Sequence, residues 1–335
     1  MACHQSSRLD PFGIGYIALL SFLLLTGCAE RLETDASVKD PIALEIAMTS
    51  WQQDKTGPMV AAVEKLAEET GLFIRSPTID HQAAWQSAWI TAHDSFLSAS
   101  VLQSPDNFRR IDAWPIETGF LDSLPDYPGS GIVNDSTLDI TSTSLEEQHQ
   151  FTDESEVALG FHVLEYYAFE RSLGDFEVDA RNYQKRQQVI QLVAELLLRD
   201  ITAFSTSQKT GTEASEDSYP LLLSKIQRRL QLVFSEFNLL GEHSPHSGRS
   251  SQNVGAQLGA IAELLDEPVG LNHFLIELNP ESAQTFNETI IEAQTLLPAT
   301  GQPDEAASSR LLLLIASLSQ QLGDFVKMLP GEGEI

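Results

Sequence analysis

A histidine and a glutamate three residues apart are the first side chains in this sequence that could do chemistry together. His162 and Glu165 lie in the stretch 157–169, which is apolar nearly all round when it is drawn as a helix. Such a helix is normally buried, and burying an unpaired carboxylate is costly. We therefore expect the pair to meet a cation, a metal ion or donors from another segment. A purely structural hydrogen-bonded couple is the open alternative.

The spacing of this pair does not match a standard zinc protease. Zincin helices carry two histidines four residues apart with a glutamate between them, and the inverted form requires His-x-x-Glu-His. Tyr166 stands where the inverted form needs its second histidine. This helix alone therefore does not predict zinc-protease chemistry.

Other histidines are predicted to have structural or solvent-exposed roles. His93 continues a stripe of two tryptophans, Trp85 and Trp89, at four-residue spacing, so we expect a core histidine there. The stretch 241–249 contains two further histidines in a pattern typical of a loop, for which we expect a solvated position or weak metal binding. Arg249, at its end, could reach a carboxylate or an anion.

Charge and cysteine content limit the classes of function. The formal net charge is −28, and nucleic-acid binding needs a basic surface, so we expect no nucleic-acid partner. The chain has two cysteines, Cys3 and Cys28, both close to the N-terminus. Thiolate metal sites are therefore excluded from the main part of the chain, and the available ligands are histidine, aspartate and glutamate.

The first 27 residues have the pattern of a secretory signal: one basic residue, a short apolar core and small residues. The sequence Leu-Thr-Gly-Cys at its end resembles a bacterial lipoprotein signal. This resemblance implies cleavage before Cys28, acylation of that residue and a polar tether over 28–40. Ala29 follows instead of aspartate, which favours a lipid anchor in the outer membrane, facing the periplasm. An ordinary cleaved signal is the alternative.

Beyond residue 40 the pattern is helical, and no alternating run typical of a sheet is present. The predicted helices cover 41–73, 77–102, 153–170, 179–204, 219–240, 251–265, 280–297 and 305–329. Gly57-Pro58 could interrupt the first of them. The stretch 104–150 is rich in proline and glycine but also in apolar residues, so we expect an ordered irregular segment. The sequence predicts an all-α protein of two packed helical bundles, at 41–209 and 210–335, with roughly four helices each.

Several of these stretches together resemble the imelysin family of bacterial envelope proteins. Residues 160–165 match the Gly-x-His-x-x-Glu motif of that family, and 110–117 (Arg-Ile-Asp-Ala-Trp-Pro-Ile-Glu) resemble the segment that precedes it. The resemblance continues through 122–125 and 130–135, and residues 247–250 resemble a loop in the second half. It spans nearly all of the chain that follows the signal, in the same order.

The resemblance implies two helical bundles with a site between them near the motif. It also implies iron-related binding or a metallopeptidase activity, because the family carries both labels. A hydrolytic metal site needs about three protein ligands, an open position and a base. His162 and Glu165 supply two ligands at most, and Asp112 and Glu117 are the candidates to complete the set. Residues expected to orient or wall the site are Arg110, Trp114, Gly160 and Arg249.

The leading hypothesis is a lipoprotein that faces the periplasm, binds a divalent or trivalent metal ion and serves iron uptake or handling. One histidine with several carboxylates is an oxygen-rich set, which favours iron and leaves zinc possible. The expected partners are the membrane, through a lipid on Cys28, and an iron-uptake protein of the envelope. The alternatives are a metallopeptidase acting on envelope peptides and a non-enzymatic binding module with a structural His–Glu pair, so enzyme activity stays open.

Overall fold

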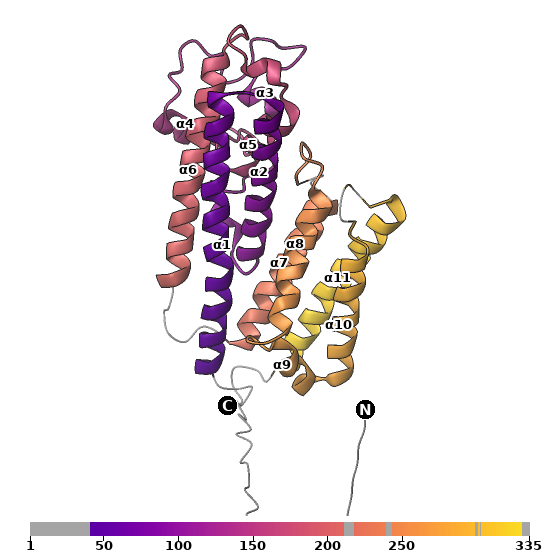
Figure 1. The fold of residues 1–335 in the computed structure, drawn as a ribbon. Coiled ribbons are helices and arrows are strands. Elements are labelled where there is room, and N and C mark those ends of the chain that lie inside the picture. The colour runs from indigo at the N-terminus through magenta and orange to yellow at the C-terminus, as the bar shows by residue number, and fades with distance from the viewer. Residues whose placement is uncertain (1–40, 211–217, 239–242, 299–300, 302, 330–335) are drawn as a thin grey trace, which may run out of the picture. The chain divides into compact units, whose positions relative to one another are not determined.

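Helices make up most of the described chain, which confirms the all-α prediction (Figure 1). This computed structural model describes residues 41–210, 218–238, 243–298, 301 and 303–329. No β-strand occurs within those ranges, only one isolated bridge. The predicted signal, the tether and Cys28 lie outside the described residues. The longer helices are α1 (Pro41–Arg75), α2 (Ile79–Ala99), α6 (Tyr183–Thr210), α7 (Tyr219–Asn238), α8 (Ser250–Leu265), α9 (Leu271–Leu278), α10 (Pro280–Thr295) and α11 (Glu305–Met328).

A first hydrophobic core forms where α1 packs along α2 and α6. Its largest side chains include Phe73 and Trp85, which stack with ring centroids 4.9 Å apart, and Phe176, which meets Phe73 edge to face. Large buried aromatics contribute most to the burial of apolar surface, so this cluster fixes how α1 and α2 lie against each other. Gly57-Pro58 does not interrupt α1, which continues through Pro58, and Met59 and the residues that follow pack into this core.

A second hydrophobic core lies among α7, α8, α9, α10 and α11. The helix α9 was not predicted from the sequence. It begins after Gly270, whose backbone adopts the left-handed conformation. By length and composition α11 could cross a membrane, but its apolar stripe from Leu311 to Phe325 is part of this core. Trp51 of α1 and Val101, in the turn after α2, also belong to it. The division of the chain at residue 210 stays a prediction.

The motif helix is shorter than the sequence predicted. It begins at Phe161 instead of Asp153, as α5 (Phe161–Glu165), and ends in one π-helical turn, η2 (Tyr166–Glu170). The residues before it use their side chains to cap local turns. Asp153 accepts from the backbone and hydroxyl of Ser155, which competes with helix formation.

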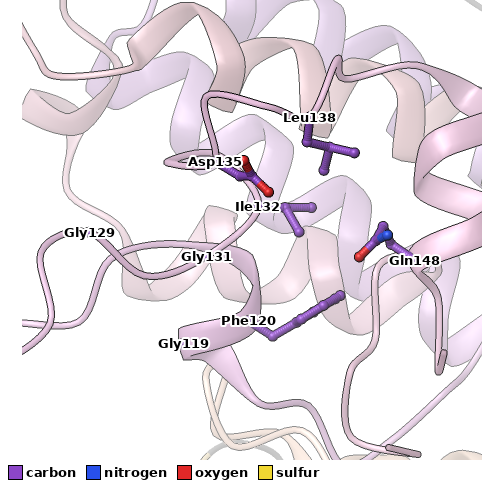
Figure 2. Close-up of a pocket in the computed structure, with 8 residues that line it drawn as sticks. All are labelled: Gly119, Phe120, Gly129, Gly131, Ile132, Asp135, Leu138 and Gln148. Atoms are coloured by element: carbon purple, nitrogen blue, oxygen red, sulfur yellow. The ribbon is translucent and has the colours of Figure 1, made fainter. Parts of the chain in front are cut away.

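The segment between α2 and α5 is largely irregular, as predicted, with three short helices: η1 (Pro105–Phe108), α3 (Thr118–Leu121) and α4 (Ser142–Gln148). Part of it surrounds an open cavity of about 490 Å³ (Figure 2). Backbone at Gly119, Gly129 and Gly131 forms much of its wall. Asp122, which follows α3 in this segment, is fully buried and forms an ion pair with Arg186 of α6. That pair fixes the irregular segment to the first core.

Candidate metal centre

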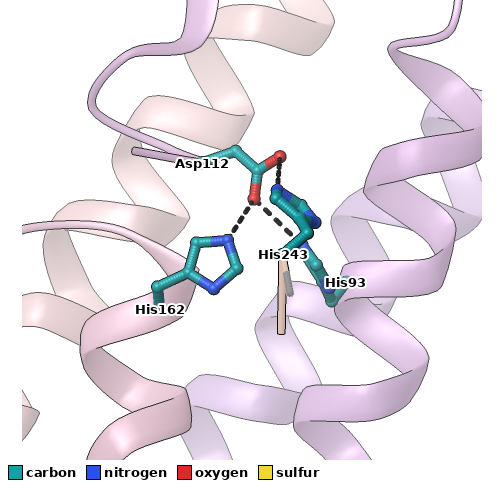
Figure 3. Close-up of side chains that lie close together, drawn as sticks. All are labelled: His93, Asp112, His162 and His243. Carbon is teal, nitrogen blue, oxygen red and sulfur yellow. Dashed lines mark hydrogen bonds and ion pairs between the residues drawn. The ribbon is translucent and has the colours of Figure 1, made fainter. Parts of the chain in front are cut away.

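Three imidazoles surround the carboxylate of Asp112 (Figure 3). They come from separate parts of the chain: His93 from α2, His162 from α5, and His243 from the segment before α8. Asp112 Oδ1 lies 2.9 Å from His93 Nε2 and 3.2 Å from His162 Nε2, and Asp112 Oδ2 lies 3.5 Å from His243 Nε2. One ligand atom from each residue falls within 4.8 Å of all the others.

All four side chains are buried. The side chains of His93 and His162 are fully covered, and those of Asp112 and His243 are 5% and 8% exposed. Burial raises the pKa of Asp112, but its interactions with His243, His93 and His162 outweigh it and hold the pKa well below its usual value. Burial likewise lowers the pKa of His93. The centre therefore contains an ionised carboxylate and at least one neutral imidazole.

Gly160 explains why Asp112 and His162 meet. Its φ is +92°, and a Cβ at this position would lie 2.4 Å from the carbonyl oxygen of Ile111. Only glycine fits such a conformation and such a close approach. Phe161, the next residue, donates its N–H to the same carbonyl at 2.8 Å. The start of α5 is thus fastened to the residue that precedes Asp112.

Glu165 lies behind His162 and outside the group of four. Its Oε2 accepts from His162 Nδ1 at 2.8 Å, and its Oε1 accepts from the N–H and the hydroxyl of Ser247 at 2.9 and 2.7 Å. Burial lowers the pKa of His162, but the carboxylates of Asp112 and Glu165 outweigh it and raise that pKa to about 9. With Nδ1 donating to Glu165, Nε2 of His162 faces Asp112, so Glu165 orients the ring.

The other two imidazoles contact tryptophans. His93 packs against Trp89 with ring centroids 4.8 Å apart, and His243 meets Trp114 at 5.6 Å. Trp114 therefore lies against the centre, where the sequence placed a wall. On the far side of His243, the amide of Asn253 lies 3.1 Å from Nδ1. These contacts fix the ring planes and direct both Nε2 atoms towards Asp112.

The structure does not bring Glu117 or Arg110 to the centre. Glu117 is exposed and caps α3 by accepting from the N–H of Gly119. Arg110 forms ion pairs with Glu146 at 2.6 Å and with Asp200 at 3.0 Å, so it does pair with carboxylates, but not with those of the centre. The expectation that Glu117 completes a ligand set has no support in this geometry.

Two members of the centre were assigned other roles in the sequence analysis. His93 was expected in the core, and it is buried there, but its Nε2 reaches Asp112. His243 was expected in a solvated loop, yet it is 7% exposed. The available signals were a histidine at the end of an aromatic stripe and a second one four residues before Ser247. Arg249 reaches the carboxylate of Asp94 at 2.7 Å, one of the two options named for it.

The donor atoms fit a transition-metal ion. Three imidazoles and one carboxylate form a set that suits zinc, ferrous iron, nickel or copper. His162 Nε2 and His93 Nδ1 are buried and make no well-formed hydrogen bond with any described residue. Buried polar atoms are almost always hydrogen-bonded, so a His162 Nε2 that lies 3.2 Å from Asp112 without a well-formed hydrogen bond is consistent with a site built for a cation.

The comparisons with known proteins agree with this fold. The family model for imelysin, labelled Peptidase M75, matches residues 57–324. Two solved structures are similar at 14% identity. One is an imelysin-like protein from Psychrobacter arcticum 273-4, with a TM-score of 0.63 over 84% of this chain and 94% of that one. The other, from Parabacteroides distasonis ATCC 8503, is described as an iron-regulated protein A precursor, with a TM-score of 0.67 over 87% and 96%. No curated protein matches the chain. Since the family model covers most of its length, the chain belongs to the imelysin family.

Proposed function

We propose that this protein binds one transition-metal ion through His93, Asp112, His162 and His243. The observation that carries the proposal is the convergence of four donor atoms from four separate segments to within 4.8 Å, in a buried position. Structural ion pairs also occur in protein interiors. A single pair does not explain why three imidazoles share one carboxylate.

The donor set favours a divalent ion. The argument for iron from the sequence assumed one histidine with several carboxylates, whereas the structure offers three imidazoles and one carboxylate. That set is less suited to ferric iron, which prefers oxygen donors, and it suits ferrous iron or zinc. We favour ferrous iron because one solved relative of the same fold is described as iron-regulated, with zinc as the competing ion.

The proposed setting is the bacterial envelope. A lipid on Cys28 would anchor the protein in the outer membrane, facing the periplasm, and an iron-uptake protein there would be its partner. The net charge of −28 supports a role with cations, because an acidic surface raises their local concentration.

A metallopeptidase is the second candidate, and the label of the family model supports it. Metal-assisted hydrolysis needs an open coordination position and a free general base. Glu165 would be the base, but hydrogen bonds to His162 and Ser247 occupy both of its oxygens. Metal-dependent cleavage of peptides that is lost in Glu165→Gln, with folding intact, would favour this alternative.

Calorimetric titration with Fe²⁺ under anaerobic conditions, Zn²⁺ and Fe³⁺ tests the proposal. We expect micromolar or tighter binding of one divalent ion, and at least a hundredfold loss in His93→Ala and His243→Ala. His273, an exposed histidine of α9, supplies the matched control His273→Ala, which should bind like the parent. Helical content by circular dichroism separates ligand loss from unfolding. No binding by the parent would refute the proposal. Unchanged binding by both His93→Ala and His243→Ala would refute the placement of the ion at these four residues.

A further inference from the structure

The metal centre is enclosed, although an ion has to reach it. This inference rests on the proposed function and concerns the route and the form in which the ion arrives. Among its four ligands, the greatest side-chain exposure is the 8% of His243. The small cavity on the far side of His243, between α7 and α8, has a volume of about 10 Å³, so it is no channel to the centre, because one water molecule alone needs roughly 10–15 Å³. Ion exchange therefore requires part of the chain to move.

Three of the four ligands sit on elements that pack in the first core. His93 is on α2 and His162 is on α5, and the residue before Asp112 is fastened to the start of α5. Moving any of them would disturb buried aromatic contacts such as that between His93 and Trp89. His243 differs, because it belongs to the irregular segment 243–249 that precedes α8.

Ring contacts of His243 and His246, hydrogen bonds to Asn253 and two polar contacts of Ser247 and Arg249 hold the segment 243–249 in place. The last two link it to the elements that carry the other ligands. Ser247 donates twice to Glu165, and Arg249 pairs with Asp94, the residue that follows His93 on α2. Both contacts are only partly buried, with the side chains of Arg249 and Asp94 19% and 34% exposed. Such contacts open more readily than an apolar core, because they expose little apolar surface when they break.

We propose that the segment 243–249 is the entrance of the centre, and that the centre takes its metal as a bare ion. When Ser247 and Arg249 release Glu165 and Asp94, His243 moves away and opens the remaining three ligands to solvent. An ion that binds there draws His243 back, and the segment closes over it. The closed centre has no room for a chelator, a haem or a peptide beside the ion.

The experiment measures exchange rates of the purified protein with Co²⁺ alone. Trp89 and Trp114 lie against two ligand imidazoles, so binding of Co²⁺ should quench tryptophan fluorescence in a stopped-flow instrument. Excess chelator then gives the dissociation rate. We expect Arg249→Gln and Asp94→Asn each to raise both association and dissociation rates about three- to tenfold, the effect of losing one partly exposed ion pair.

Two features separate an entrance from a general loss of structure. The double variant Arg249→Gln/Asp94→Asn should match either single variant, since both remove the same contact. The visible spectrum of bound Co²⁺ should not change, because the ligands are intact. Arg310, which pairs with Glu292 on the surface of the second core, provides the control Arg310→Gln, with parental rates expected. If a variant at Arg249 does not fold, Ser247→Ala removes the hydroxyl hydrogen bond to Glu165, keeps the backbone one, and should also accelerate exchange.

The outcomes distinguish this inference from the proposed function. If the parent binds no Co²⁺, Zn²⁺ or Fe²⁺, the proposed function fails and the entrance with it. If the parent binds but all variants exchange at the parental rate, the entrance alone is refuted. Haemin and ferric citrate are then tested as intact complexes. Micromolar binding of either that is lost in His243→Ala would overturn the bare-ion part, and absence of binding supports it.

Discussion

Proton release on metal binding is the sharpest test of the centre. A metal ion binds only the neutral form of an imidazole, so a protonated ligand must lose its proton first. The carboxylates of Asp112 and Glu165 raise the pKa of His162 to about 9. At pH 7, roughly 1% of His162 would then be neutral. Burial keeps His93 neutral, and Asp112 is already ionised, so neither contributes a proton.

The pKa of about 9 for His162 sets the direction and the size of the pH dependence of metal affinity. The apparent affinity should rise about tenfold per pH unit from pH 7 towards pH 9 and level off above it. At pH 7 it should be about a hundredfold weaker than at the plateau, or about 2.7 kcal/mol. His162 should release about one proton for each ion bound at pH 7.

The assay is calorimetric titration with Zn²⁺ at pH 7 in buffers with different ionisation enthalpies, whose slope gives the number of protons released. Glu165→Gln keeps an acceptor for His162 Nδ1 but removes a charge that raises the pKa of that ring. We expect fewer protons released and a flatter pH profile in this variant. If the parent protein binds Zn²⁺ at pH 7 but releases no proton, the assignment of His162 as a protonated ligand is refuted.

Three further predictions concern positions around the centre. Glu117→Ala should leave ion affinity unchanged in the same titration, because the side chain caps a short helix on the surface; a tenfold loss would return it to the ligand set. Gly160→Ala should destabilise the fold by about 2–4 kcal/mol in urea unfolding, through strain at positive φ and a clash with the carbonyl of Ile111. Asp122→Asn should cost about 3–5 kcal/mol by leaving Arg186 buried and unpaired; a change below 1 kcal/mol would contradict a structural role for that pair.

Local sequence patterns predicted much of the fold. Helical periodicity placed α7, α8, α10 and α11 within a few residues of their ends, because each has one apolar stripe that faces a core. It failed where local chemistry was stronger than periodicity. Side chains such as Ser155 cap turns before the motif, and Gly160 forces a positive φ, so α5 starts eight residues later than predicted. The lipid anchor, the membrane setting and the domain boundary stay predictions.

The sequence by itself determined that a buried His162–Glu165 pair needs a partner and that thiolates are absent from the main part of the chain. The resemblance to the family added Asp112 and Glu117 as candidates. Only the tertiary structure decided that His93 and His243 complete the group of four. It also decided that Glu165 contacts His162 Nδ1 from outside that group. The physical reason is sequence distance. Helical spacing relates residues within one turn or two, whereas these four ligands come from segments that meet only when α2, α5 and the start of α8 pack together.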